Sequence, residues 1–78
     1  MPKTKIEWAI VENVRTIRKQ KKKTQRDVAS LFDVSPGYIG QIETETSASM
    51  YSFNNLNELA KYLGCSMRDF MPEKPIEA

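Results

Sequence analysis

The sequence of 78 residues has no histidine and a single cysteine, Cys65. One cysteine excludes an intramolecular disulfide, and without histidine no set of Cys and His ligands can hold a structural zinc ion. No apolar run approaches the ~18 residues that cross a bilayer, and no apolar block of a signal peptide follows the N-terminus. These absences predict one small cytoplasmic domain, with no metal and no cofactor, that side-chain packing stabilises.

The side chains that most enzymes use are also missing. Histidine, the most frequent general base, is absent, and no carboxylate pair can be assigned to one pocket. The chain has only three glycines and no glycine-rich phosphate loop. We therefore predict a protein that is not an enzyme and has no catalytic residues.

Net charge is small, at +2, but the two signs are separated along the chain. Residues 1–26 carry nine basic and two acidic side chains, whereas residues 27–78 carry three basic and eight acidic ones. A basic end on a small domain favours a polyanion as the partner. A solvated helix face also explains a run of lysines, so charge alone does not decide between the two.

Apolar spacing and capping signals predict five helices, and no segment alternates as a strand would. The first helix covers about residues 5–21, and the second runs to about Phe32. The third runs from Pro36 to about Thr44, the fourth ends at Gly64, and a short fifth helix contains Phe70 and Met71. Caps that start these four are Thr24 with Asp27, Ser35 with Pro36, Ser52, and Ser66 with Asp69. Pro72 prevents continuation, which leaves one domain over residues 1–71 and a tail over 72–78.

The predicted core combines one apolar stripe from each long helix. On the first helix the stripe is Ile6, Ile10, Val14 and Ile17, with Val11 beside it. The later helices and the turn contribute Val28, Ala29, Val34, Ile39, Ile42, Phe53, Leu56, Leu59, Ala60 and Leu63.

The segment from Ser35 to Glu43 raises a question of its own. Ser followed by Pro is a strong start signal for a helix, yet Gly37 and Gly40 each cost ~1 kcal/mol relative to alanine. Ahead of this segment, Ala29 lies four residues before Asp33, which can adopt the left-handed conformation of a tight turn. A small side chain allows two steeply crossing helices to approach closely, so the spacing is that of a helix-turn-helix.

Several linked pieces carry a family resemblance: VRTIR at 14–18, TQRDVASLFDVSPGYIGQIE at 24–43 and LAKYLGCS at 59–66. Over about residues 10–71 the chain resembles the lambda-repressor-like helix-turn-helix family, also called the Cro/repressor or XRE family. The resemblance implies an all-α fold of five helices, with the helix-turn-helix formed by helices two and three. It also implies binding to double-stranded DNA, with the third helix in the major groove and the second across the backbone.

The resemblance and the exposed face of the third helix together assign candidate DNA contacts. Base reading is expected from Pro36, Gly37, Tyr38 and Gln41, because Gln41 can pair with adenine and Tyr38 can pack on a thymine methyl group. Backbone contacts are expected from Gln25, Arg26, Lys22, Lys23, Ser35, Gly40 and Thr44, with Lys19 as a further candidate. For Gln25 the alternative is a solvated polar side chain.

Two further family positions are structural. Arg18 and Glu43 match positions whose side chains pair internally, joining the first helix to the end of the third. Cys65 matches an apolar position, which favours core packing over a reactive thiol.

The match departs from the family at the loop after Glu43, which is longer and has no basic residue. Glu45 in this loop would repel phosphate. The first functional hypothesis is sequence-specific DNA binding by a small transcriptional regulator, a repressor acting as a homodimer. The alternative is a protein-interaction module, such as an antitoxin or adaptor, with weak or no DNA binding. For a dimer surface, Trp8, Met50, Tyr51 and the fifth helix are the candidates.

Overall fold

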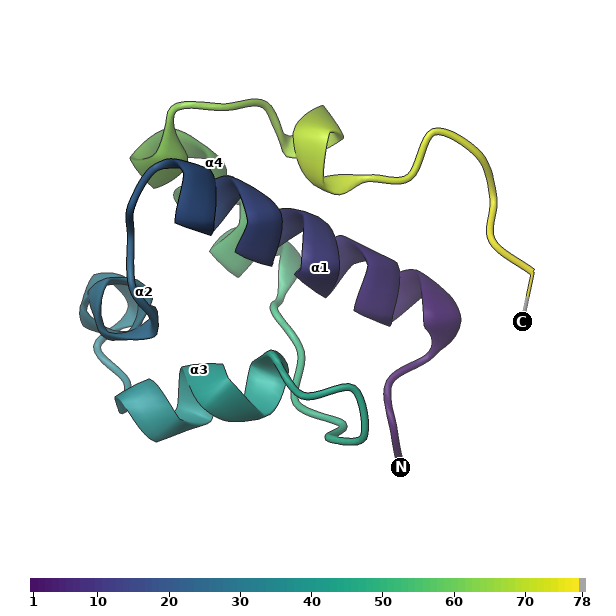
Figure 1. The fold of residues 1–78 in the computed structure, drawn as a ribbon, viewed down its shortest axis with the longest axis horizontal. Helices are drawn as coiled ribbons and strands as arrows, with labels where there is room; N and C mark the ends of the chain where they lie inside the picture. Colours follow the sequence, from purple (N-terminus) through teal and green to yellow (C-terminus); the bar gives the residue numbers. More distant parts are fainter. Residues whose placement is uncertain (78) are drawn as a thin grey trace.

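The computed structural model describes residues 1–77, and within this range it contains four α-helices, one 3-10 helix and no strand (Figure 1). The elements are α1 (Lys5–Gln20), α2 (Gln25–Phe32), α3 (Pro36–Ile42), α4 (Phe53–Leu63) and the 3-10 helix η1 (Met67–Phe70). In the described part of the chain, no helix is long and apolar enough to cross a membrane. Residue 78, the last of the predicted tail, lies outside the described residues.

Hydrogen bonds from capping side chains start each helix. At α2 the Asp27 amide donates to the Thr24 hydroxyl at 3.1 Å, and the Thr24 amide donates to the Asp27 carboxylate at 2.8 Å. The predicted caps Ser35, Ser52 and Ser66 start α3, α4 and η1. The sequence reading missed the cap of α1, where Thr4 pairs with Glu7 in the same reciprocal way.

The predicted fifth α-helix is a 3-10 helix of four residues, and this part of the prediction is corrected. Pro72 lacks an amide N–H and disfavours a helical conformation in the residue before it. Met71, expected inside the helix, is accordingly extended, with φ −94° and ψ 139°. A single turn remains, for which i to i+3 hydrogen bonds suffice.

The core combines residues from all five elements, with Val11, Val14, Val28, Ile39 and Phe70 fully buried. Burial also covers Cys65 in part and, together with the Asp69 carboxylate, raises the pKa of its thiol. This environment suits a packing residue, as expected for Cys65.

Three residues expected in the core are exposed instead. Ile6 is 40% exposed, because the buried face of α1 is centred on Val11, Val14 and Arg18 and Ile6 lies at its edge. Phe53 is 80% exposed, because it is the first residue of α4 and projects from the rim of the core. Val34 is 37% exposed, because it lies in the turn between Asp33, which ends α2, and Ser35, which caps α3, and not within a helix.

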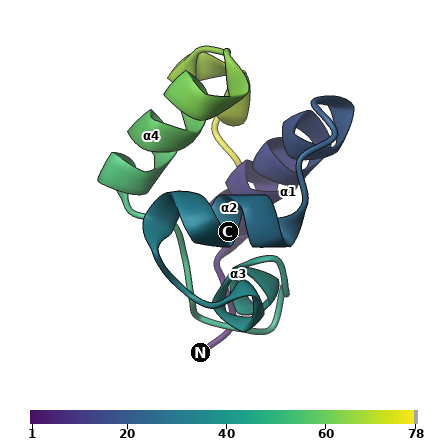
Figure 2. The same ribbon diagram turned by 90° about the vertical axis from the view of Figure 1, so that its left-hand side faces the viewer.

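The helix-turn-helix is formed by α2 and α3. In Figure 2, α3 is seen end on and α2 lies across it. Ala29 is 1% exposed, and its carbonyl accepts a hydrogen bond of 3.0 Å from the Val34 amide, which closes the turn. Asp33 ends α2 in the left-handed conformation predicted for it, with φ 56° and ψ 46°.

Replacing Asp33 tests this turn. Asp33→Gly should equal or exceed the stability of the wild type, because glycine adopts a positive φ without strain. Asp33→Val should lose ~1–2 kcal/mol, because a β-branched side chain is strained in this conformation. Urea unfolding followed by circular dichroism measures both, with Ser30→Val on the exposed, right-handed surface of α2 as the control. Equal losses for the Asp33→Val and Ser30→Val variants would contradict the assignment.

Candidate nucleic-acid interface

One side of α3 faces solvent along its whole length. Ile39 and Ile42 point into the core with 0% and 1% exposure. The opposite side presents the four residues expected to read bases, which are all exposed: Pro36, Gly37, Tyr38 and Gln41. At 100° per residue, Gly37 lies at the centre of this face, Gln41 lies to one side of the centre, and Tyr38 lies at the edge.

The two glycines of α3 are not required by the fold. Both lie in an ordinary right-handed helix, since Gly64 is the only glycine with positive φ in residues 1–77. A Cβ on Gly37 would meet nothing closer than the Ser35 Oγ at 3.9 Å, and one on Gly40 nothing closer than the Gln25 Oε1 at 3.6 Å. Alanine would fit at both positions and would favour the helix by ~1 kcal/mol each. The glycines therefore keep the outer surface of α3 free of side chains at these two positions, and packing of the core does not require them.

A buried ion pair connects α1 to the end of α3. Arg18 donates to Glu43 through Nε at 2.9 Å and Nη2 at 2.7 Å, and its Nη1 donates to the Lys23 carbonyl at 2.8 Å. Both side chains are nearly inaccessible, with 7% and 3% exposure. Arg15, to which the sequence analysis assigned no role, contributes a further positive charge 3.8 Å from Glu43.

Electrostatics keeps Glu43 ionised in this position. Burial by itself would raise its pKa, but hydrogen bonds from Arg18 and Gln25 and the charges of Arg18 and Arg15 outweigh it. The net result is a Glu43 pKa below the ordinary value of 4.5. The carboxylate is thus a fixed negative centre at the C-terminal end of α3.

Gln25 is oriented by the same carboxylate. Its Nε2 donates to Glu43 Oε1 at 3.0 Å, and its Oε1 lies beside Gly40. A carboxamide has two N–H donors, so one remains for an acceptor outside the protein. The side chain is partly exposed at the start of α2 and therefore suits a contact to a phosphate.

The other residues expected to contact a DNA backbone differ in their available donors. The Ser35 hydroxyl accepts from the Tyr38 amide at 3.2 Å and keeps its own proton for an external acceptor. Thr44 is different, because its hydroxyl donates to the Gly40 carbonyl at 2.7 Å and its amide to the Gln41 carbonyl at 3.1 Å. A phosphate only accepts hydrogen bonds, so a Thr44 contact would require one of these bonds to open.

The basic residues between α1 and α2 also separate into two groups. Arg26 and Lys22 are exposed, and Lys22 adopts a positive φ of 59° at the turn. The Lys23 ammonium lies 5.2 Å from the ring centre of Tyr62 on α4 and so already has a partner within the protein. Arg26 and Lys22 are therefore better placed than Lys23 for an external anion.

The sequence analysis also missed Lys3. This residue is 7% exposed, and its ammonium donates to the carbonyls of Gln41, Thr44 and Ser47 at 3.3, 2.7 and 2.8 Å. The partners lie about forty residues away, and nothing near Lys3 in the sequence signals the contact.

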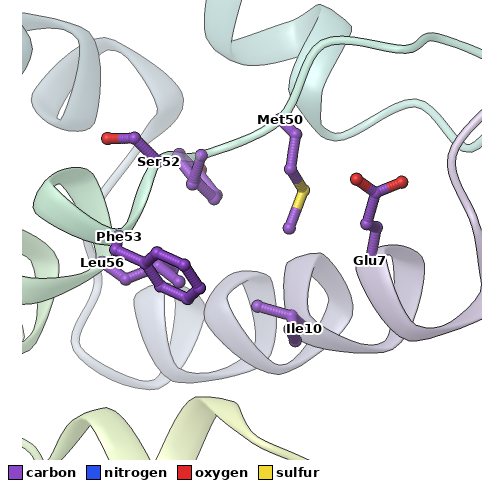
Figure 3. Close-up of a pocket in the computed structure, with 7 residues that line it drawn as sticks. Glu7, Ile10, Met50, Ser52, Phe53 and Leu56 are labelled. Atoms are coloured by element: carbon purple, nitrogen blue, oxygen red, sulfur yellow. The ribbon is translucent and has the colours of Figure 1, made fainter. Parts of the chain in front are cut away.

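An apolar groove of about 380 Å³ lies elsewhere, between α1, the segment 50–52 and the start of α4. Figure 3 shows Met50 pointing toward Ile10, with Glu7 and Phe53 at opposite ends. Glu7, the one carboxylate in its lining, already accepts from the Thr4 amide at 2.8 Å. Of the predicted dimer contacts, Met50 and Tyr51 both line this groove, but Tyr51 is only 5% exposed, and Trp8 is partly buried against the core.

Comparison with known proteins places this geometry in a family. A family model described as helix-turn-helix matches residues 14–70, which is most of the chain. No curated protein and no solved structure matches the sequence. The match includes all of α2, α3 and α4 but excludes Lys3 and the first half of α1.

Acid should unfold the protein by protonating Glu43. Because the folded pKa lies below the ordinary value of 4.5, the stabilisation is fully present above the unfolded pKa and is lost as pH falls through the folded one. Glu43→Gln should remove the contribution of Glu43 to the pH dependence and cost ~3–5 kcal/mol at neutral pH, because Arg18 is left buried and unpaired. Guanidinium unfolding between neutral pH and pH ~3 measures both effects.

A matched variant separates the ion pair from the side-chain volume. Arg18→Met with Glu43→Leu removes both charges, and this double variant should be more stable than Glu43→Gln. If Glu43→Gln unfolds at the wild-type denaturant concentration, the pair does not stabilise the fold.

Proposed function

The chain belongs to the XRE, lambda-repressor-like helix-turn-helix family, and we propose that it is a transcription regulator that inserts α3 into the major groove of DNA. One observation carries this proposal: α3 has glycine at positions 37 and 40, although the surrounding structure would accept alanine at both. The two glycines keep the outer side of the helix free of side chains at these positions. A fold selected for stability alone would gain from filling them. A helix that lies against base edges would not.

Base reading is assigned to the residues on the exposed face of α3. Gln41 lies beside its centre and can donate to and accept from adenine through a bidentate contact, worth ~1–3 kcal/mol of discrimination. Tyr38, 41% exposed at the edge, can pack on a thymine methyl group or donate to a phosphate. Pro36 and Gly37 add little hydrogen bonding and instead allow close approach.

Backbone contacts are assigned to the start of α2 and to the cap of α3. Gln25 has a donor left over after its bond to Glu43, and Ser35 has a hydroxyl proton. Arg26 and Lys22 supply exposed positive charge beside them. Lys23 and Thr44 are the weakest members of the predicted set, because their polar groups already have partners within the protein.

The finer assignments are that the protein represses transcription, acts as a homodimer and resides in the cytoplasm with its DNA. A single module of this kind buries ~600–1,000 Å² on DNA, so a second copy on a second half-site supplies affinity and specificity that one lacks. The absence of an acid–base constellation in the sequence supports a role without catalysis.

A protein-interaction module is the second candidate, and the apolar groove favours it. Phe53 is 80% exposed at the rim of the groove, and the loop after α3 carries Glu45 and no basic side chain. Such a module would keep the fold but bind DNA weakly or not at all.

Titration of a random-sequence duplex at two salt concentrations separates the two candidates. A DNA-binding protein should bind at low salt, and log K should fall against log[salt] with a slope of roughly −2 to −4 for two to four neutralised phosphates. Selection from a random library should then enrich one motif, bound by two copies. No binding even at low salt would remove DNA binding and leave the interaction module.

Replacing the glycines should raise stability and lower DNA affinity together. Gly37→Ala and Gly40→Ala should each stabilise the fold by up to ~1 kcal/mol, because helix propensity improves without a clash. The same methyl groups should weaken binding to the selected duplex by about tenfold or more. Asn57→Ala on the exposed side of α4 is the control, since it also improves propensity but should leave affinity unchanged. Unchanged affinity in the glycine variants would show that this face does not approach DNA.

A further inference from the structure

The Lys3 ammonium occupies a site built entirely from backbone carbonyls. Its three N–H donors match the three acceptors of Gln41, Thr44 and Ser47. The Lys3 amide also donates to the Glu45 carbonyl at 3.2 Å. The segment ahead of α1 is thereby fastened along residues 41–47, and Figures 1 and 2 both place the N-terminus at the α3 side of the molecule.

These carbonyls form the end of α3 and the start of the loop that follows. The last carbonyls of a helix have no partner within the helix and carry partial negative charge, which a cation stabilises. Burial lowers the pKa of Lys3, and the Glu7 carboxylate opposes that shift. Only the protonated form has three N–H donors for these three carbonyls, so Lys3 closes the helix end as a charged ammonium.

The loop held in this way has few means of attracting DNA. It lacks basic residues, and Glu45 is negative and exposed. Within residues 1–77, no protein acceptor is bonded to the amide of Glu45 or Thr46, so these N–H groups are left for an outside acceptor such as phosphate. Uncharged amides position a duplex only when the backbone that carries them is fixed.

We propose that Lys3 is a positioning residue for DNA binding, which holds the end of α3 and residues 44–47 in the shape that meets the DNA backbone without touching DNA itself. The inference rests on the proposed function. It concerns a residue outside the region 14–70 that matches the family. The N-terminal segment is thus part of the DNA-binding unit of this chain.

Lys3→Met tests the proposal, because methionine keeps an apolar stem but has no donor. We expect affinity for the duplex selected by the wild type to fall by about tenfold or more, measured by fluorescence anisotropy at a temperature where circular dichroism shows the variant folded. The slope of log K against log[salt] should stay at its wild-type value, because a lysine that contacts no phosphate releases no counterion. Amide hydrogen exchange at residues 43–47 should accelerate in the free protein. Lys5→Met, an exposed neighbour, is the control and should leave affinity and exchange unchanged.

Three outcomes would overturn the inference. These are unchanged affinity, a salt slope reduced by ~0.9, which would indicate a direct phosphate contact, and an affinity loss that only follows the unfolded fraction. If Lys3→Met does not fold, Lys3→Arg replaces it, because the planar guanidinium keeps the charge but cannot serve three carbonyls from one point; wild-type affinity would again overturn the inference. A wild type that binds no DNA removes the proposed function, whereas a wild type and Lys3→Met that bind equally remove only this inference.

Discussion

The Arg18–Glu43 pair is the interaction on which both the fold and its candidate DNA-binding face depend. Arg18 joins α1 to the end of α3 and also binds the Lys23 carbonyl in the turn that leads to α2. Glu43 in turn orients Gln25 at the start of α2. Two side chains, 7% and 3% exposed, therefore set the relative positions of three helices. Loss of either side chain alone would leave a buried, unpaired charge, so the two residues depend on each other.

Local signals in the sequence were sufficient to predict the four α-helices, but not the 3-10 form of the last turn or the burial of every helix face. The caps at Thr24, Ser35, Ser52 and Ser66 bond to residues two or three positions later, so a short stretch of sequence contains the whole signal. The left-handed turn at Asp33 is local in the same sense. The exposed Ile6 and Phe53 could not be identified in this way, because burial at the end of a helix depends on which other element lies there. Periodicity predicts which side of a helix is apolar, but not how far along the helix another element covers that side.

In the candidate site, too, local features could be predicted from the sequence and long-range contacts could not. Exposure of Tyr38 and Gln41 follows from helical spacing once Ile39 and Ile42 are assigned to the core. The Arg18–Glu43 pair was expected only through a family resemblance, because twenty-five residues separate its members. The lysine that closes α3 had no such support, since it precedes the region that matches the family. Long-range polar contacts of this kind have no periodic signature in one sequence.

The slim outer face of α3 explains why so many contacts converge on this short helix. Seven residues with two glycines would not form a stable helix alone, since nucleation is costly and glycine adds to the loss. Its stability must come from elsewhere: Ile39 and Ile42 bury its inner side, Ser35 caps its start, and Glu43 and the Lys3 ammonium fix its end. These contacts offset the stability that α3 loses through the glycines on its exposed side. The residues on the outer face of α3 can therefore suit a binding partner, because the helix does not depend on their helix propensity for its stability.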